Sequence, residues 1–374
     1  MNALLIVGPS GRAAAFSALR AELSPWCLDQ FADRDLARIA VVQRLAGTFP
    51  ETLLAAFQTL PLPAQTPWLY TGGLENHPRI LRRLQQLRPQ LWGNDAVRVR
   101  RVRDRHWLAE RCREVGLEMP PEGSWPPGPG RWLVKPVSSA GGRGIRPWSD
   151  TEPSERPAGW YVQRWCAGVP VGVIFVGLAE RTVFLGATRQ LVGLPYLGGS
   201  PFAYQGSVGP LTLPAPVQAA LEALASKLDL RGLFGIDGLL DGERFWVLEV
   251  NPRYSASVEV LEYAGSFAAL AWHQSAWETA NVPLRLPDPR RIVAKAIVYA
   301  KRGVVFPATG PWDAALIQPA NSLRTFADIP AEGEPIPAGA PICTLFATAA
   351  SSEAALTQIE QSVEQMEKSI HADR

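Results

Sequence analysis

Residues 233–253 read LFGIDGLLDGERFWVLEVNPR, and this stretch decides the fold. Apolar residues flank Asp241-Gly242, a pair that favours a tight turn, on both sides, so the stretch predicts a β-hairpin. Glu249 and Asn251 are two residues apart. A strand therefore places their side chains on the same face of the hairpin.

The length of the turn decides whether Asp237 shares that face. A two-residue loop would put Asp237 opposite Trp246, on the other face. A three-residue loop, 241–243, with a bulge at residue 242 or 243, brings it to the face of Glu249. We predict the three-residue loop.

These side chains predict a site for a hard cation. Oxygens of Asp237, Glu249 and Asn251 suit Mg²⁺, or Mn²⁺, which usually keeps waters and phosphate oxygens as further ligands. Arg253 follows two residues after the asparagine, where it could meet developing negative charge. The alternative is a half-buried hairpin whose acids only face water.

The pattern Asp-x11-Glu-x-Asn-x-Arg resembles the metal-binding strands of the ATP-grasp superfamily. Members of this superfamily activate a carboxylate with ATP and transfer it to a nucleophile. The resemblance implies an α/β (α+β) ATP-grasp fold with ATP and Mg²⁺ (or Mn²⁺) as cofactors. It covers residues 100–262 well and the flanking parts loosely, and it is closest to a branch of predicted carboligases related to biotin carboxylase.

Composition describes a folded protein of 374 residues with 47% hydrophobic and 19% charged residues and a net charge of +2. This balance disfavours disorder and a globally electrostatic partner such as nucleic acid. The four cysteines lack a CxxC pair, which suits a reducing compartment, and we expect a cytoplasmic protein. No apolar run of membrane-spanning length occurs, so no membrane partner is expected.

Lys135 is the only lysine among the first 226 residues of a chain with 32 arginines. It ends a predicted strand, 131–137, and precedes the loop Ser138-Ser-Ala-Gly-Gly-Arg-Gly144. Glycines let backbone N–H groups approach phosphate oxygens, and an ammonium neutralises their charge. The predicted triphosphate contacts are Lys135, Ser138, Ser139, Gly141, Gly142 and Gly144. An ordinary glycine-rich hairpin loop is the alternative.

Two further groups follow from the resemblance. Gln163, Arg164 and Trp165 would present backbone groups to adenine at a hinge near 163–168, although Pro170 stands where the family often has a ribose-binding acid. Arg105 stands at the start of a predicted helix where the family usually has a phosphate-binding lysine, and an arginine can also hold phosphate. An arginine cluster surrounds it, which we interpret as a solvated helix face.

The chain should divide into a Rossmann-like domain at 1–93, an ATP-grasp core at 94–285 and a β-rich C-terminal domain with a final helix at 286–374. In the first domain, strands are predicted at 3–7, 38–42 and 68–70, and helices at 12–23, 51–60 and 78–87. Later parts include an apolar hairpin at 171–188, a helix at 216–228, one helix from about 259 to 280, and a helix at 354–370.

The loop region between residues 188 and 207 lacks a core-forming period and is rich in glycine, aromatic and polar residues. Such loops often determine specificity. We predict Arg189, Tyr204 and Ser255 as substrate contacts, with a purely structural loop as the alternative. Ser257 occupies the position of the bicarbonate base in biotin carboxylases, which disfavours bicarbonate as a substrate.

The resulting hypothesis is an ATP-dependent carboxylate–amine ligase that works through an acyl phosphate and releases ADP and phosphate. Arg253 would be the catalytic residue, the partners would be a small carboxylate and an amine, and a homodimer is compatible with the sequence. Addition of an amino acid such as glutamate to a pterin or furan one-carbon coenzyme is the pathway that the resemblance suggests. A small-molecule kinase and a non-catalytic ATP-binding module are the alternatives.

Overall fold

The computed structural model describes residues 2–278, 286, 288–320 and 322–371. The first unit is a parallel four-stranded sheet in the order β3-β2-β1-β4. This arrangement fits the Rossmann-like domain predicted for residues 1–93. Its strands are β1 (Ala3–Gly8), β2 (Ser24–Asp29), β3 (Val41–Arg44) and β4 (Trp68–Tyr70), and its helices include α1 (Arg12–Arg20), α2 (Arg34–Ala37), α3 (Leu53–Thr59), the 3-10 turn η1 (Leu74–Asn76) and α4 (Pro78–Leu87).

Most predicted elements of this unit form, with one shift. The strand expected at 38–42 begins at Val41, because α2 and its last turn occupy the residues before it. β2 was not predicted, since Pro25 and Asp29 interrupt its short apolar pattern. The Gly11 N–H, just before α1, donates to the Asp29 carboxylate at the end of β2.

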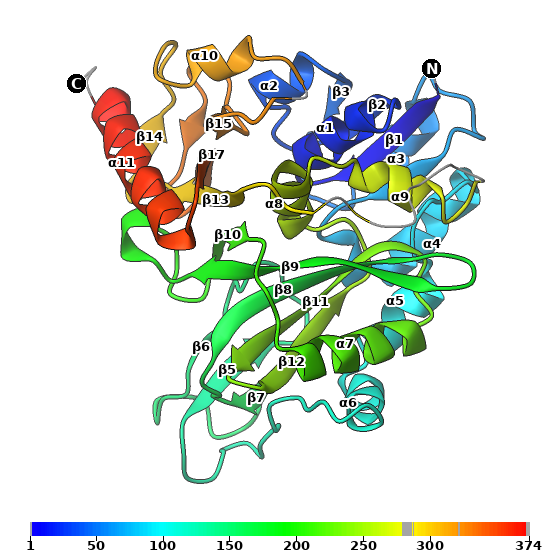
Figure 1. The fold of residues 1–374 in the computed structure, drawn as a ribbon, viewed down its shortest axis with the longest axis vertical. Helices are drawn as coiled ribbons and strands as arrows, with labels where there is room; N and C mark the ends of the chain where they lie inside the picture. Colours follow the sequence, from blue (N-terminus) through cyan, green and yellow to red (C-terminus); the bar gives the residue numbers. More distant parts are fainter. Residues whose placement is uncertain (1, 279–285, 287, 321, 372–374) are drawn as a thin grey trace.

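An eight-stranded sheet forms the centre of the molecule, in the order β12-β11-β8-β9-β10-β13-β17-β15. Its long strands cross the view in Figure 1. The strands are β8 (Val169–Gly177), β9 (Thr182–Val192), β10 (Tyr204–Gly209), β11 (Gly232–Asp241), β12 (Arg244–Asn251), β13 (Ile292–Tyr299), β15 (Phe326–Ala327) and β17 (Pro341–Ala349). Because β10 pairs with β13, the predicted boundary at 285/286 separates neighbours within one sheet.

Helices cover both faces of this sheet. α7 (Ala215–Lys227) packs with α6 (Arg105–Arg113) over one face, in a cluster that includes Phe175, Phe234 and Val247. α8 (Ala256–Gly265) and α9 (Ala269–Gln274) cover the other face. The single helix predicted from 259 to 280 is therefore wrong, because Ser266 adopts a left-handed conformation (φ 53°) that ends α8. Residues 279–285, which include the end of that predicted helix, lie outside the described part.

A small antiparallel sheet, β6-β5-β7, lies at the opposite end of the molecule from the two termini (Figure 1). It contains β5 (Trp132–Pro136), β6 (Arg146–Pro147) and β7 (Trp160–Arg164), as predicted for the strand that carries Lys135. α5 (Ala96–Val102) and α6 connect the first unit to it, and Asp104 caps α6 by accepting from the N–H groups of His106 and Trp107.

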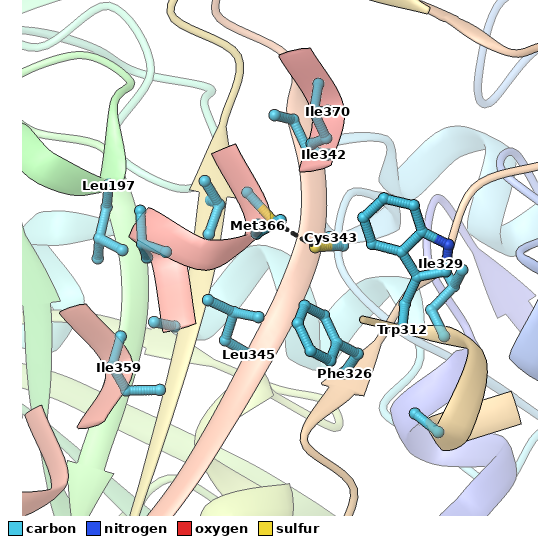
Figure 2. Packing of buried hydrophobic residues seen from close by; sticks show 14 of the residues in the cluster. Leu197, Trp312, Phe326, Ile329, Ile342, Cys343, Leu345, Ile359, Met366 and Ile370 are labelled. Carbon is cyan, nitrogen blue, oxygen red and sulfur yellow. Dashed lines mark hydrogen bonds between the residues drawn. The ribbon is translucent and has the colours of Figure 1, made fainter. Parts of the chain in front are cut away.

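The C-terminal part packs its own core against the end of the large sheet. α11 (Ser352–His371) buries Ile359, Val363 and Met366 against β17 and β13, which confirms the predicted final helix. In Figure 2, Met366 meets Cys343 and lies beside Leu345 and Phe326. The remaining elements are η2 (Pro195–Leu197), β14 (Val304–Val305), α10 (Asp313–Leu316) and β16 (Pro335–Ile336).

A buried ionic network connects the three parts. Arg12 of α1 is 1% exposed and contacts both Glu259 of α8 and Asp328 after β15, the latter at 2.9 Å. Lys295 of β13 donates to Glu259 at 2.7 Å. The two cations hold the pKa of Glu259 well below its usual range despite its burial. Among the described helices, none is both long and apolar enough to cross a bilayer.

Candidate nucleotide and metal site

The hairpin brings Asp237, Glu249 and Asn251 together as predicted. Asp237 lies directly opposite Glu249, and the Asn251 amide nitrogen donates to Asp237 at 2.8 Å, with the Glu249 carboxylate 3.4 Å away. The predicted turn is wrong, however. Asp241 pairs with Arg244 across a two-residue loop.

The register change lies inside β12 instead of in the turn. Gly238 pairs with Val247 and Asp237 with Glu249, so Leu248 is the extra, bulged residue. A bulge of one residue reverses the face that the rest of the strand presents. The bulge therefore places Glu249 and Asn251 on the same face as Asp237. With the two-residue loop and no bulge, they would lie on the opposite face.

Burial and repulsion favour the protonated form of Asp237. Burial, and then the nearby Glu249 charge, raise the pKa of Asp237 to about 7. The amides of Gln190, at 2.9 Å, and Asn251 donate to Asp237 and offset only part of this rise. No third acid, histidine or cysteine joins the two carboxylates to form a group of three within the described residues.

Gln190 was missed by the sequence analysis, and Arg189 was misplaced. β9 extends to Val192, beyond the strand predicted to end at residue 188, so residues 189 and 190 alternate faces. Gln190 points to Asp237, and Arg189 is an exposed residue on the opposite face. The structure therefore does not bring Arg189 to the cluster.

Tyr204 and Ser257 extend the polar face beyond the carboxylates. The Tyr204 hydroxyl lies 2.8 Å from Ser207 Oγ, which lies 3.0 Å from Ser257 Oγ, and Ser207 is opposite Gln190 in the sheet. Ser255 precedes α8 as its N-cap residue, near Gly235. These polar side chains lie next to Gln190, the partner of Asp237, on the side of the sheet where β10 meets β13.

Lys135 lies across from the hairpin on the small sheet. Its ammonium donates to Gln163 Oε1 at 2.9 Å, and burial lowers its pKa while the Glu249 charge raises it. Arg105 is paired with Glu122, and its guanidinium carbon lies 4.0 Å from the centre of the Tyr161 ring. Lys135 and Arg105 therefore add positive charge on the side of the site that faces Glu249.

The loop after Lys135 adopts backbone conformations that need glycine. Gly141, Gly142 and Gly144 have φ values of 61°, 76° and 82°. A Cβ at Gly142 would lie 1.8 Å from the Phe202 carbonyl oxygen. The Tyr204 N–H donates to the Gly141 carbonyl, so the loop at 138–144 rests on the loop that precedes β10.

Two backbone N–H groups of the predicted hinge are already bonded within the protein. The N–H groups of Arg164 and Trp165 donate to the carbonyls of Pro121 and Arg131, at 2.8 and 2.9 Å. The Gln163 side chain is 2% exposed and holds Lys135. A purine could thus not use those two N–H groups, and Gln163 acts here through its side chain.

Arg253 is held by a residue of the first unit that sequence reasoning also missed. Glu75 Oε1 accepts from Arg253 Nε at 3.1 Å and from Nη2 at 2.8 Å. Arg253 also donates to Asn251 Oδ1 at 3.1 Å. The position of Glu75 after a buried strand and two glycines, Thr71-Gly-Gly73, was the available signal.

Comparison with known proteins agrees with this arrangement. Residues 102–257 match the family model described as the ATP-grasp domain, and no curated protein matches the chain. A biotin carboxylase complex from Campylobacter jejuni has a TM-score of 0.74 and 12% identity, over 97% of this chain and 91% of that one.

Two ligases also have similar folds. An L-amino acid ligase from Bacillus licheniformis has a TM-score of 0.67 at 15% identity, covering 97% of both chains. A phosphoribosylamine–glycine ligase from Thermotoga maritima has 0.65 at 16%, covering 97% of this chain and 96% of that one. At these identities the likeness concerns the fold, and it confirms the predicted fold class.

Proposed function

We propose that this chain, which contains an ATP-grasp domain, is an ATP-dependent ligase that joins a small carboxylate to an amine and releases ADP and phosphate. One observation carries the proposal: Asp237 and Glu249 lie opposite each other on the hairpin, and the Glu249 charge acts on Lys135, which precedes the glycine-rich loop. Opposed carboxylates and cations suit a bound metal–triphosphate, in which both charges are neutralised.

The residues present fit a divalent cation. The exposed Glu249 carboxylate repels the half-buried Asp237 carboxylate, and two amide groups offset this only in part. Asp237, Glu249 and Asn251 would hold Mg²⁺, or Mn²⁺, which supplies positive charge to phosphate oxygens. Gly172 supports the fit, because a Cβ there would meet Asp237 Oδ1 at 3.2 Å and Gln190 Nε2 at 3.0 Å.

The residues also fit a triphosphate. Lys135 would neutralise phosphate charge, and Ser138, Ser139, Gly141, Gly142 and Gly144 would supply hydroxyl and backbone donors. Arg105, which lies over Tyr161 of the small sheet, would also contact phosphate by exchanging its ion pair with Glu122 for a phosphate oxygen. Because the N–H groups of Arg164 and Trp165 are already bonded, adenine would contact the hinge through backbone carbonyl groups and the Gln163 side chain.

The chain's own residues would perform three tasks. Lys135 and the loop orient the phosphates, and Arg253 stabilises negative charge on the transferring phosphoryl group and on the tetrahedral centre that the amine creates. The substrate carboxylate oxygen bonds to the γ-phosphorus as the bond to ADP breaks. The amine then displaces phosphate from the acyl carbon and loses a proton, and no protein nucleophile is needed.

Tyr204, Ser207 and Ser257 are the side chains next to the cluster that would contact the substrate pair. Addition of an amino acid to a pterin or furan coenzyme is the finer part of the proposal. The similarity to an L-amino acid ligase and a phosphoribosylamine–glycine ligase supports amide formation in general.

Thermal-shift titration with Mg-ATP tests the site directly. Ligand that binds the native state at a hundredfold excess over Kd should stabilise it by about 2.7 kcal/mol. We expect Lys135→Ala and Glu249→Gln to abolish the shift without unfolding the protein. A folded wild type that shows no shift with any nucleoside triphosphate would refute the proposal.

Acid and amine screening would then separate the reactions. A ligase releases phosphate only when both the acid and the amine are present. A kinase would consume ATP with one hydroxyl substrate alone, and that outcome would replace amide formation.

A further inference from the structure

The turn η1 of the first unit reaches the arginine of the candidate site. Glu75 is 3% exposed, and one of its oxygens accepts from two nitrogens of Arg253. Gly73 precedes the turn with φ 98°. A Cβ at Gly72 would lie 3.6 Å from the Arg253 guanidinium carbon, so the backbone of the first unit lies directly against this side chain.

The same turn also holds the glycine-rich loop. Asn76 Nδ2 donates to the Ser139 carbonyl at 3.2 Å, and Asn76 Oδ1 accepts from Arg103 at 2.8 Å. Two neighbouring residues of one turn therefore contact the arginine and the phosphate loop.

The contacts of Arg253 leave it little freedom. Nε and Nη2 donate to Glu75, Nη2 also donates to Asn251, and Nη1 donates to the Tyr254 carbonyl at 3.2 Å. A guanidinium has five N–H groups. Within the described residues one N–H of Nη1 has no hydrogen-bond partner, which leaves it available to an oxygen in the site.

We propose that Glu75 is a positioning residue that fixes the orientation of Arg253 toward the transferring phosphoryl group, an inference that rests on the proposed function. Lost orientation weakens charge stabilisation more than it weakens ground-state binding, because the donors must be in place where charge develops. The first unit is then part of the reaction site, through a residue that touches neither substrate nor metal.

The alternative is a buried ion pair that only stabilises the fold. Glu262 supplies a matched control, because it is 1% exposed, pairs with Arg20 at 2.6 Å and likewise joins α8 to the first unit. Glu262→Gln should lower stability as Glu75→Gln does. It should leave the site unchanged.

The experiment compares two ligands of the intact protein: MgADP alone, and MgADP with aluminium fluoride, which mimics the transferring phosphoryl group. Isothermal titration gives both dissociation constants. For Glu75→Gln we expect MgADP binding within about twofold of wild type. We expect the extra affinity from aluminium fluoride to fall about tenfold, or about 1.4 kcal/mol, with partial recovery in Glu75→Asp.

A second measurement keeps the inference testable if Glu75→Gln folds poorly. Residues that act through one another show non-additive effects. In the wild-type background, Glu75→Asp should lower the affinity gained from aluminium fluoride. In an Arg253→Lys background, the same substitution should cause little further loss.

The outcomes separate the two proposals. Unchanged aluminium fluoride affinity in Glu75→Gln and Glu75→Asp, or an equal loss in Glu262→Gln, would overturn the positioning role alone. A wild type that binds neither ligand would overturn the proposed function together with it.

Discussion

Replacement of Asp237 by asparagine should stabilise the protein without metal and remove its response to Mg²⁺. The side chain lies opposite Glu249 on the neighbouring strand. Gln190 donates to Asp237, and the Asn251 amide contacts both carboxylates. Asparagine has nearly the same shape and can donate to Glu249. The substitution therefore removes repulsion while it also removes a metal ligand.

The pKa sets the sign and the ceiling of the effect. Burial and Glu249 raise the pKa of Asp237 from 3.8 to about 7. Between these values the native state holds a proton that the unfolded state has lost, so rising pH lowers stability. A difference of about three pKa units corresponds to at most about 4 kcal/mol. Because Asp237 is only half-buried and asparagine is also costly to bury, we expect a gain of roughly 1–2 kcal/mol above pH 7.

Urea unfolding in EDTA at pH 4 and pH 8 measures this difference. Asp237→Asn should be more stable than wild type at pH 8 and nearly equal to it at pH 4. Asp241→Asn, an exposed acid at the end of the same strand, is the control and should show no such pH dependence. If Asp237→Asn lost stability equally at both pH values, the repulsion argument would be wrong. Addition of Mg-ATP should stabilise wild type more than the variant.

Three other predictions concern separate parts of the molecule. Lys135→Ala should raise the Kd for Mg-ATP at least about tenfold with little loss of stability, because burial already disfavours this ammonium; calorimetry measures both. Gly142→Ala should displace its loop from a backbone carbonyl, so proteolysis between residues 138 and 144 should accelerate and Mg-ATP should protect less well. Glu259→Gln removes the buried carboxylate that pairs with both Arg12 and Lys295. The free energy of unfolding, measured in urea, should fall by about 3–5 kcal/mol. A loss under about 1 kcal/mol would show that these ion pairs contribute little to stability.

Local periodicity was sufficient to predict the hairpin and the face that Glu249 and Asn251 share. Glu249 and Asn251 lie on one face because strand residues alternate, and glycine was needed at Gly142 because of its positive φ. The bulge at Leu248 could not be placed from sequence, since a leucine fits a regular strand as well as a bulged one. The correct face for Asp237 was thus predicted with the wrong turn.

Long-range contacts explain the residues that were missed. Gln190 meets Asp237 across 47 positions, and Glu75 meets Arg253 across 178. Neither glutamine nor glutamate has a local pattern that identifies its distant partner. Arg189 was misplaced for a local reason, because β9 is longer than its apolar core. The homodimer and the cytoplasmic location stay predictions.

The contacts of Arg12 bear on how this protein can change over evolution. A single guanidinium joins acids from the helix after the hairpin and from the C-terminal part. Recombination that replaced the first 93 residues with a foreign segment lacking this arginine would leave the half-buried Asp328 without it and the buried Glu259 with Lys295 alone. The three parts are therefore expected to be inherited together, and a successful chimaera would have to transplant the arginine with its acceptors.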